Sequence, residues 1–190
     1  MAQRIPPVPD EQMPSNPHAR RSGISRVMAH APTVMPSYSL FTEAIFARLS
    51  LDPMERELAV LAALHLEGGE YQWVHHEVIG AELGVSREQI EAIGRGDFSG
   101  PMFSERQKAL LAYVRQVVKN VRVDDATFAA AAKHFSNREL VETIFTVGSY
   151  MILARITEVA RVPPDPPFGI ESLRAAEARV AAEKAAGGGS

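Results

Sequence analysis

The chain has 190 residues, of which 46% are hydrophobic and 23% charged, and its formal net charge is −3. This length suffices for one domain with a hydrophobic core, and the slight negative charge gives no general attraction to phosphate backbones or anionic membranes. Without cysteine, the chain has no disulfides, thiolate metal sites or thiol chemistry. No stretch approaches the ~18 apolar residues of a membrane span, and no secretory signal is evident, so we expect a cytoplasmic protein.

The chain divides by composition. Residues 1–22 are rich in proline and are expected to form an extended or disordered arm. A helical domain is predicted over 23–162, followed at 163–186 by a proline-rich linker and a C-terminal helix. That helix carries a thin apolar stripe of Ile170, Leu173 and Val180, which needs a partner surface. The closing Gly-Gly-Gly-Ser at 187–190 resembles an appended expression linker.

Helix start and stop signals recur through the domain. Starts are marked by the N-cap pair Asp52-Pro53, by Asp124, and by capping boxes at Ser86…Gln89, Ser104…Gln107 and Ser136…Glu139. Glycines at 68–69, 84 and 94–96 mark stops, and no stretch alternates with a period of two. These patterns predict an all-α, single-domain helical bundle built around a helical hairpin at 52–84.

The helix expected at about 137–160 is apolar on two rows, which predicts a place at the centre of the core. One row is Leu140, Ile144, Val147 and Met151, and the other is Val141, Phe145, Gly148 and Ile152.

Two titratable residues of the predicted hairpin fall on its apolar faces. Glu57 shares a helical row with Val60 and Leu61, and His76 shares one with Trp73 and Ile79. If the chain turns near residue 69, the two residues are offset by roughly 6–8 Å along the helix axes, and the axes lie about 8–10 Å apart. Two long side chains can bridge most of that distance. A buried glutamate beside a histidine can tune the imidazole as a base near neutral pH. A satisfied core histidine and a structural buried acid are the alternative interpretations.

Aromatic and polar side chains surround this histidine in the sequence. Tyr71, Gln72, Trp73 and His76 fall within six residues, a mixture of apolar walls and polar groups typical of small-molecule pockets. Tyr150, on the long helix, could also reach such a pocket, although a packed tyrosine with a bonded hydroxyl is the commoner situation.

The stretches RELAVL (56–61), EYQWVHH (70–76) and AELGVS (81–86) resemble the carboxymuconolactone decarboxylase and alkylhydroperoxidase D superfamily. The likeness is greatest to its cysteine-free branch, whose Tyr-Glu-Trp-x-x-His signature has Gln72 here in place of the glutamate. The resemblance implies an all-helical fold around a helical hairpin, assembled as a homotrimer or homohexamer.

The resemblance also implies roles for individual residues. The peroxidase branch carries a Cys-x-x-Cys pair at the positions of Gly69 and Gln72, so thiol peroxidase activity is excluded. The decarboxylase branch works without a cofactor, which implies a lyase that uses His76 as general acid or base on a small carbonyl or lactone acid. Glu57 would orient His76 or relay its proton. Tyr71 and Trp73 would wall the substrate, and no cofactor or metal is expected.

Several alternatives remain open from the sequence. A non-catalytic oligomer that binds a small hydrophobic molecule fits the same pocket, as does a lactone hydrolase in which the histidine activates water. The residue pattern at 81–93 also fits a DNA-binding helix-turn-helix. Its second helix, however, carries the negative charges of Glu88 and Glu91, which phosphate groups repel, so no nucleic-acid partner is expected. Neighbouring residues His75 and His76 diverge by about 100° on a helix and cannot share a metal ion.

Overall fold

The structure, a computed structural model, describes residues 2–13 and 21–187. Within these ranges the regular elements are all helical, which confirms the predicted all-α class. The elements are η1 (Asp10–Gln12), α1 (Gly23–Met28), α2 (Met35–Ala47), α3 (Pro53–Glu67), α4 (Glu70–Glu82), α5 (Arg87–Gly94), α6 (Glu105–Asn120), α7 (Asp125–Ala132), α8 (Asn137–Ala160) and α9 (Glu171–Gly187).

The helix ends follow the local signals in the sequence. Ser86, Ser104 and Ser136 each form a capping box at the start of α5, α6 and α8. Asp52 accepts hydrogen bonds from the first backbone N–H groups of α3, and Gly68 ends that helix at φ +70°, in the left-handed region that glycine adopts without strain. The hairpin predicted at 52–84 is therefore formed by α3 and α4.

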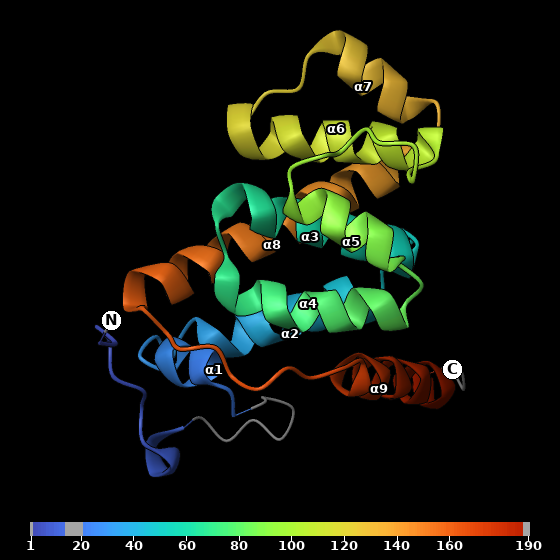
Figure 1. The fold of residues 1–190 in the computed structure, drawn as a ribbon. Helices are drawn as coiled ribbons and strands as arrows, with labels where there is room; N and C mark the ends of the chain where they lie inside the picture. The colour runs from blue at the N-terminus through green and yellow to red at the C-terminus, as the bar shows by residue number, and fades with distance from the viewer. Residues whose placement is uncertain (1, 14–20, 188–190) are drawn as a thin grey trace.

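Helix α3 lies at the centre of the bundle. It contacts α4, α5, α6 and α8, and its residues 58–63 are fully buried. Figure 1 shows α6 and α7 at one end of the molecule, α9 at the other, and the α3–α4 hairpin between them. The run 58–64 of α3 is apolar on every side, so this part of the helix needs the neighbours that surround it here.

The N-terminal arm packs on its own chain where it is described. The backbone N–H of Arg4 donates to the carbonyl of Ala160 at 2.8 Å, and that of Val8 donates to the carbonyl of Arg26 at 3.2 Å. Val8 is buried against Ala29 and Met35. Residues 14–20, which were included in the predicted arm, lie outside the described residues.

The apolar stripe of the C-terminal helix also finds its partner within the chain. Leu173 and Val180 are buried, and α9 packs against α2. Gly187 is the last residue of α9, and the rest of the predicted linker, 188–190, lies outside the described residues.

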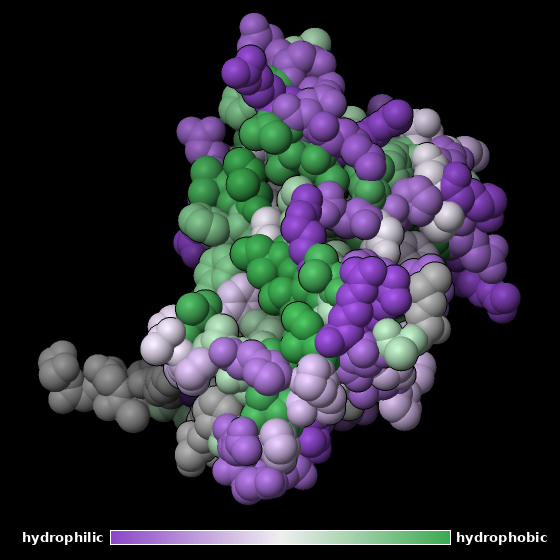
Figure 2. All heavy atoms as spheres, turned by 90° about the vertical axis from the view of Figure 1, so that its left-hand side faces the viewer, coloured by the Kyte–Doolittle hydropathy of each residue, from purple (hydrophilic) through white to green (hydrophobic). Residues whose placement is uncertain are grey.

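Helix α8 differs from the prediction on both rows. Leu140 and Val147 of its first row are buried in the core, but Ile144 of that row is 44% exposed. The second row is exposed, with Val141 50%, Phe145 55% and Ile152 48% exposed. The second row faces away from α3, so it is not part of the core of this chain. Figure 2 shows apolar side chains gathered in the middle of one face of the molecule. By length and composition alone α8 could cross a membrane, yet half of its most apolar window is buried against the bundle.

Candidate active site

The turn at Gly68 brings Glu57 of α3 and His76 of α4 into direct contact. Glu57 Oε2 lies 2.6 Å from His76 Nδ1, and the two residues are 0% and 5% exposed. Both side chains come from rigid helices packed against each other, so the contact is fixed by the hairpin itself. Glu57 and His76 are nineteen residues apart in the sequence, and this separation lets them face each other across the two antiparallel helices of the hairpin.

A second charge holds Glu57 from its other side. Arg56 Nε lies 3.2 Å from Glu57 Oε1, and Arg56 Nη1 donates to the carbonyl of Phe46 at 3.0 Å. Burial raises the pKa of the Glu57 carboxyl, but His76 and then Arg56 lower it by more, so its pKa lies below the ordinary value. Glu57 is therefore a carboxylate at neutral pH.

The carboxylate sets the chemistry of the imidazole. Because Glu57 accepts a hydrogen bond from Nδ1, the neutral ring of His76 carries its lone pair on Nε2, toward the cavity. Tyr150 lies edge-on to this ring, with the ring centroids 4.7 Å apart at 86°. Burial and then the Glu57 charge raise the pKa of Tyr150 well above its ordinary value, so its hydroxyl stays protonated.

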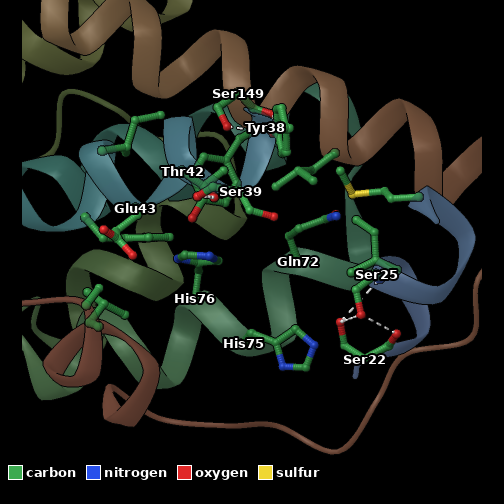
Figure 3. Close-up of a pocket in the computed structure, with 18 of the residues that line it drawn as sticks. Ser22, Ser25, Tyr38, Ser39, Thr42, Glu43, Gln72, His75, His76 and Ser149 are labelled. Carbon is green, nitrogen blue, oxygen red and sulfur yellow. Dashed lines mark hydrogen bonds between the residues drawn. The ribbon is translucent and has the colours of Figure 1, made fainter. Parts of the chain in front are cut away.

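His76 lines a cavity of about 290 Å³ between α1, α2, α4, α8 and α9. Figure 3 shows His76 and Gln72 reaching into it from α4, with Tyr38, Ser39 and Thr42 on the opposite side. Its walls are mainly apolar and include Met28, Met35, Ile45, Phe46, Ile79 and Leu153. A concave apolar space with a few convergent polar groups is typical of small-molecule sites.

Gln72 and Tyr71 both line this cavity but differ in their freedom to bind a ligand. Gln72 Oε1 accepts from the hydroxyl of Thr157 at 3.3 Å, while its Nε2 atom is buried without a partner. The hydroxyl of Tyr71 donates to Asp165 at 2.5 Å and accepts from the backbone N–H of Ile24 at 3.2 Å. Tyr71 is thus a wall whose polar end ties α4 to α1 and to the segment before α9.

Trp73 lies outside this cavity, so the structure does not place it as a wall beside His76. Its indole N–H donates to Glu77 at 2.7 Å, and the ring lines a separate hollow with His65, Glu91 and Gly94. The reason is helical geometry: the faces of Gln72 and His76 are aligned, whereas Trp73 is turned about 100° from Gln72.

The structure adds polar residues that the sequence did not single out for this site. Tyr38 of α2 donates to the backbone carbonyl of Ser149 at 3.0 Å and contacts its hydroxyl at 2.7 Å, and both residues line the cavity. Burial raises the pKa of Tyr38, so this hydroxyl is also protonated. Glu43 of α2 and Arg179 of α9 form an ion pair of 2.8 Å that also lines the cavity.

His75 takes a different direction from its neighbour His76. Its ring stacks on Phe168, with centroids 4.0 Å apart, and meets Tyr71 edge-on. Across residues 2–13 and 21–187, no three His, Asp or Glu side chains gather in a way that could hold a metal ion.

Comparisons with known proteins agree with this architecture. The sequence model of the carboxymuconolactone decarboxylase family matches residues 32–116. No curated protein matches the sequence significantly.

Solved structures resemble the whole fold at low sequence identity. A cysteine-to-alanine variant of the debrominase Bmp8, solved with 2,3,4-tribromopyrrole, superimposes with a TM-score of 0.71 at 17% identity over 95% of this chain and 98% of its own. An uncharacterized peroxidase-related protein from Ralstonia eutropha, with an alkylhydroperoxidase AhpD core, gives 0.68 at 18% identity, covering 82% and 80%. A protein of unknown function from Agrobacterium tumefaciens, suggested to be an antioxidant defence protein AhpD, gives 0.67 at 20% identity, covering 73% and 95%.

The fold and the buried histidine–glutamate pair define an all-helical protein of AhpD-like architecture that contains no cysteine. The match of residues 32–116 to the carboxymuconolactone decarboxylase family model and the AhpD-like fold of these neighbours both agree with the resemblance found in the sequence. The resemblance found in the sequence is thereby confirmed.

Proposed function

We propose that this chain is a cofactor-free enzyme in which His76 acts as general acid or base on a small carbonyl or lactone acid. The observation that carries the proposal is the buried 2.6 Å contact between His76 Nδ1 and the Glu57 carboxylate, which leaves Nε2 for the cavity. A positioned general acid or base typically contributes about 10²–10⁴-fold to such a reaction, because the proton is transferred within the transition state.

The reaction that best suits the site is a decarboxylation. The bond between the carboxylate and the α-carbon of a β-keto-type acid breaks, carbon dioxide leaves, and the electron pair moves to the carbonyl as an enolate. Protonated His76 Nε2 then delivers its proton to the carbon, and the ring regains a proton from water. Glu57 holds the imidazole in place throughout and stabilises its cationic form, because the carboxylate stays charged beside it.

The cavity supports a compact and largely apolar substrate. A volume of about 290 Å³ with mainly aliphatic and aromatic walls favours one small ring. The structurally similar debrominase was solved with 2,3,4-tribromopyrrole, which is a ligand of that kind. We propose that Tyr150, Tyr71 and Gln72 contact such a ring in this chain. Trp73, which lines the other hollow, is left out of this set.

The proposal is tested by carbon dioxide release and ultraviolet change with a panel of carboxylated lactones and β-keto acids. The native protein is compared with His76→Ala, and His65→Ala serves as control because His65 lines the separate hollow. Turnover that is lost in His76→Ala and kept in His65→Ala supports the proposal. Equal turnover in all three proteins contradicts the catalytic role of His76.

The same cavity also suits two other functions, a binder of a small hydrophobic molecule and a lactone hydrolase. Gln72 stands where the family signature has a glutamate, which removes a proton-transfer group and favours a binder of a small hydrophobic molecule. If the native protein binds compounds of the panel of lactones and β-keto acids without turning them over, the binding function is supported. Lactone opening without carbon dioxide release selects a hydrolase in which His76 activates water.

We also propose that copies of the chain associate through the exposed row of α8 as a homotrimer or homohexamer. Val141, Phe145 and Ile152 leave an apolar stripe in water, and Phe41 of α2 extends it through an edge contact with Phe145. The predicted cytoplasmic location stays a prediction, as does the expectation of no nucleic-acid or membrane partner.

A further inference from the structure

The amide of Gln72 is the most unusual polar group of the cavity wall. Gln72 is 4% exposed and precedes His76 by one helical turn on the same face of α4. Its Oε1 atom accepts from Thr157, but its Nε2 atom has no hydrogen-bond partner although it is buried. Buried amide donors nearly always have a partner, so an unpaired one at a cavity wall indicates a place for a ligand acceptor.

Two features favour the orientation of the amide that leaves Nε2 toward the cavity. The hydroxyl of Thr157 meets Oε1 at 3.3 Å, and Oε1 also lies near Gly69, 3.5 Å from where a Cβ of that residue would stand. Gly69 is the N-cap of α4 and provides no side-chain cap, so the positive end of the helix favours an oxygen there. Figure 3 shows Gln72 extending from α4 among the residues that line the cavity.

We propose that Gln72 selects ligands by donating its Nε2–H to an acceptor oxygen, either a carbonyl or the enolate formed from it. Residues four apart on a helix have Cβ atoms about 5–6 Å apart, so a ligand that bonds Gln72 places the adjoining carbons near His76 Nε2. The acceptor oxygen and the reacting carbon of the ligand therefore lie within two or three bonds, as in a β-keto acid or a lactone. This inference rests on the proposed function for its catalytic consequence and deepens it by defining the substrate.

Thr157 is a positioning residue in this arrangement. It touches the oxygen end of the amide rather than the ligand, and its one hydroxyl proton is shared with the backbone carbonyls of Ala154 at 3.0 Å and Leu153 at 3.1 Å. Replacing Thr157 by Val keeps the shape but removes this shared proton, so the orientation of the amide is held less firmly. Thr146 offers a matched control, because it is a buried threonine of α8 bonded to Glu142 and does not line the cavity.

The test compares two neutral ligands of nearly equal shape, acetophenone and ethylbenzene, which differ by a carbonyl oxygen in place of two hydrogens. Ligand-observed NMR titration gives both dissociation constants for the native protein and for Gln72→Leu, Thr157→Val and Thr146→Val. Circular dichroism melting checks that each variant is folded. We expect the native protein to prefer acetophenone about threefold to tenfold, the range of one neutral hydrogen bond.

The preference should disappear in Gln72→Leu, fall in Thr157→Val and persist in Thr146→Val. A native protein without preference, or a preference that survives in Gln72→Leu, overturns the proposal, and a full preference in Thr157→Val overturns the role of Thr157. If the ligand preference behaves as expected while the native protein releases no carbon dioxide, the proposed reaction fails and the role of Gln72 in recognition stands.

Discussion

Replacing Glu57 by Gln removes the negative charge at the centre of the buried cluster. Glu57 is 0% exposed and Arg56 is 2% exposed, so the substitution leaves the buried guanidinium of Arg56 without its counter-ion. Removing one partner of a buried ion pair typically destabilises a protein by about 3–5 kcal/mol. The glutamine oxygen can still accept from His76 Nδ1, so we expect a loss near the lower end, about 3 kcal/mol.

The loss is measured by urea unfolding followed by far-ultraviolet circular dichroism, which reports on the helices. A lower midpoint with an unchanged slope shows a change in stability rather than in the unfolded state. The double variant Arg56→Met with Glu57→Gln should lose less than Glu57→Gln alone, because it no longer buries an unpaired cation. Glu91→Gln is the control, since Glu91 pairs with Arg87 on the surface. A loss below about 1 kcal/mol in Glu57→Gln would refute the reasoning.

Three further predictions follow from the same structure. Because folding lowers the pKa of Glu57, its charge contributes fully to the free energy of unfolding above the ordinary value of 4.5, and this contribution is lost as the pH falls toward the folded pKa. In an acid titration, the free energy of unfolding should therefore fall less steeply in Glu57→Gln than in the native protein. Parallel curves for the two proteins would contradict this. Phe145→Ser should shift the protein from an oligomer to smaller species in size-exclusion chromatography with light scattering; a native protein that is itself a monomer, or a variant of unchanged size, would contradict association through this row. Gly69→Ala should lower the free energy of unfolding by about 1–3 kcal/mol in thermal unfolding, because the Cβ of the new alanine would stand 2.9 Å from Leu64 and 3.0 Å from Ala154. An unchanged melting temperature would contradict this overpacking.

The helix boundaries could be predicted from the sequence because caps are local. Ser86, Ser104 and Ser136 bond to residues three positions later, and Gly68 needs only its own backbone freedom. The closeness of Glu57 and His76 was predictable for a related reason. Once the turn is placed, helical rise gives an axial offset of roughly 6–8 Å; the direct contact of 2.6 Å that the structure shows is closer than this estimate.

The rest of the cavity depends on contacts between distant segments. Tyr38 meets Ser149 across more than a hundred residues, and α2 shows little apolar asymmetry that would mark which of its faces is buried. Trp73 is predicted to lie beside His76 because they are three residues apart on α4, but the face of α4 that lines the cavity carries Gln72 and His76, and Trp73, turned about 100° from Gln72, lines the other hollow. The exposed row of α8 shows the same limit: apolar spacing predicts burial without saying whether the neighbour is the same chain or another copy.

The close packing around Gly69 bears on which side chains this turn can hold. By the resemblance, this residue stands where the peroxidase branch has the first cysteine of its pair, and a side chain here would meet both Leu64 and Ala154. Placing a thiol at this position therefore requires the Leu64 side chain or helix α8 to shift, so the packing of α3 against α8 separates this chain from the peroxidase branch as much as the residue itself does.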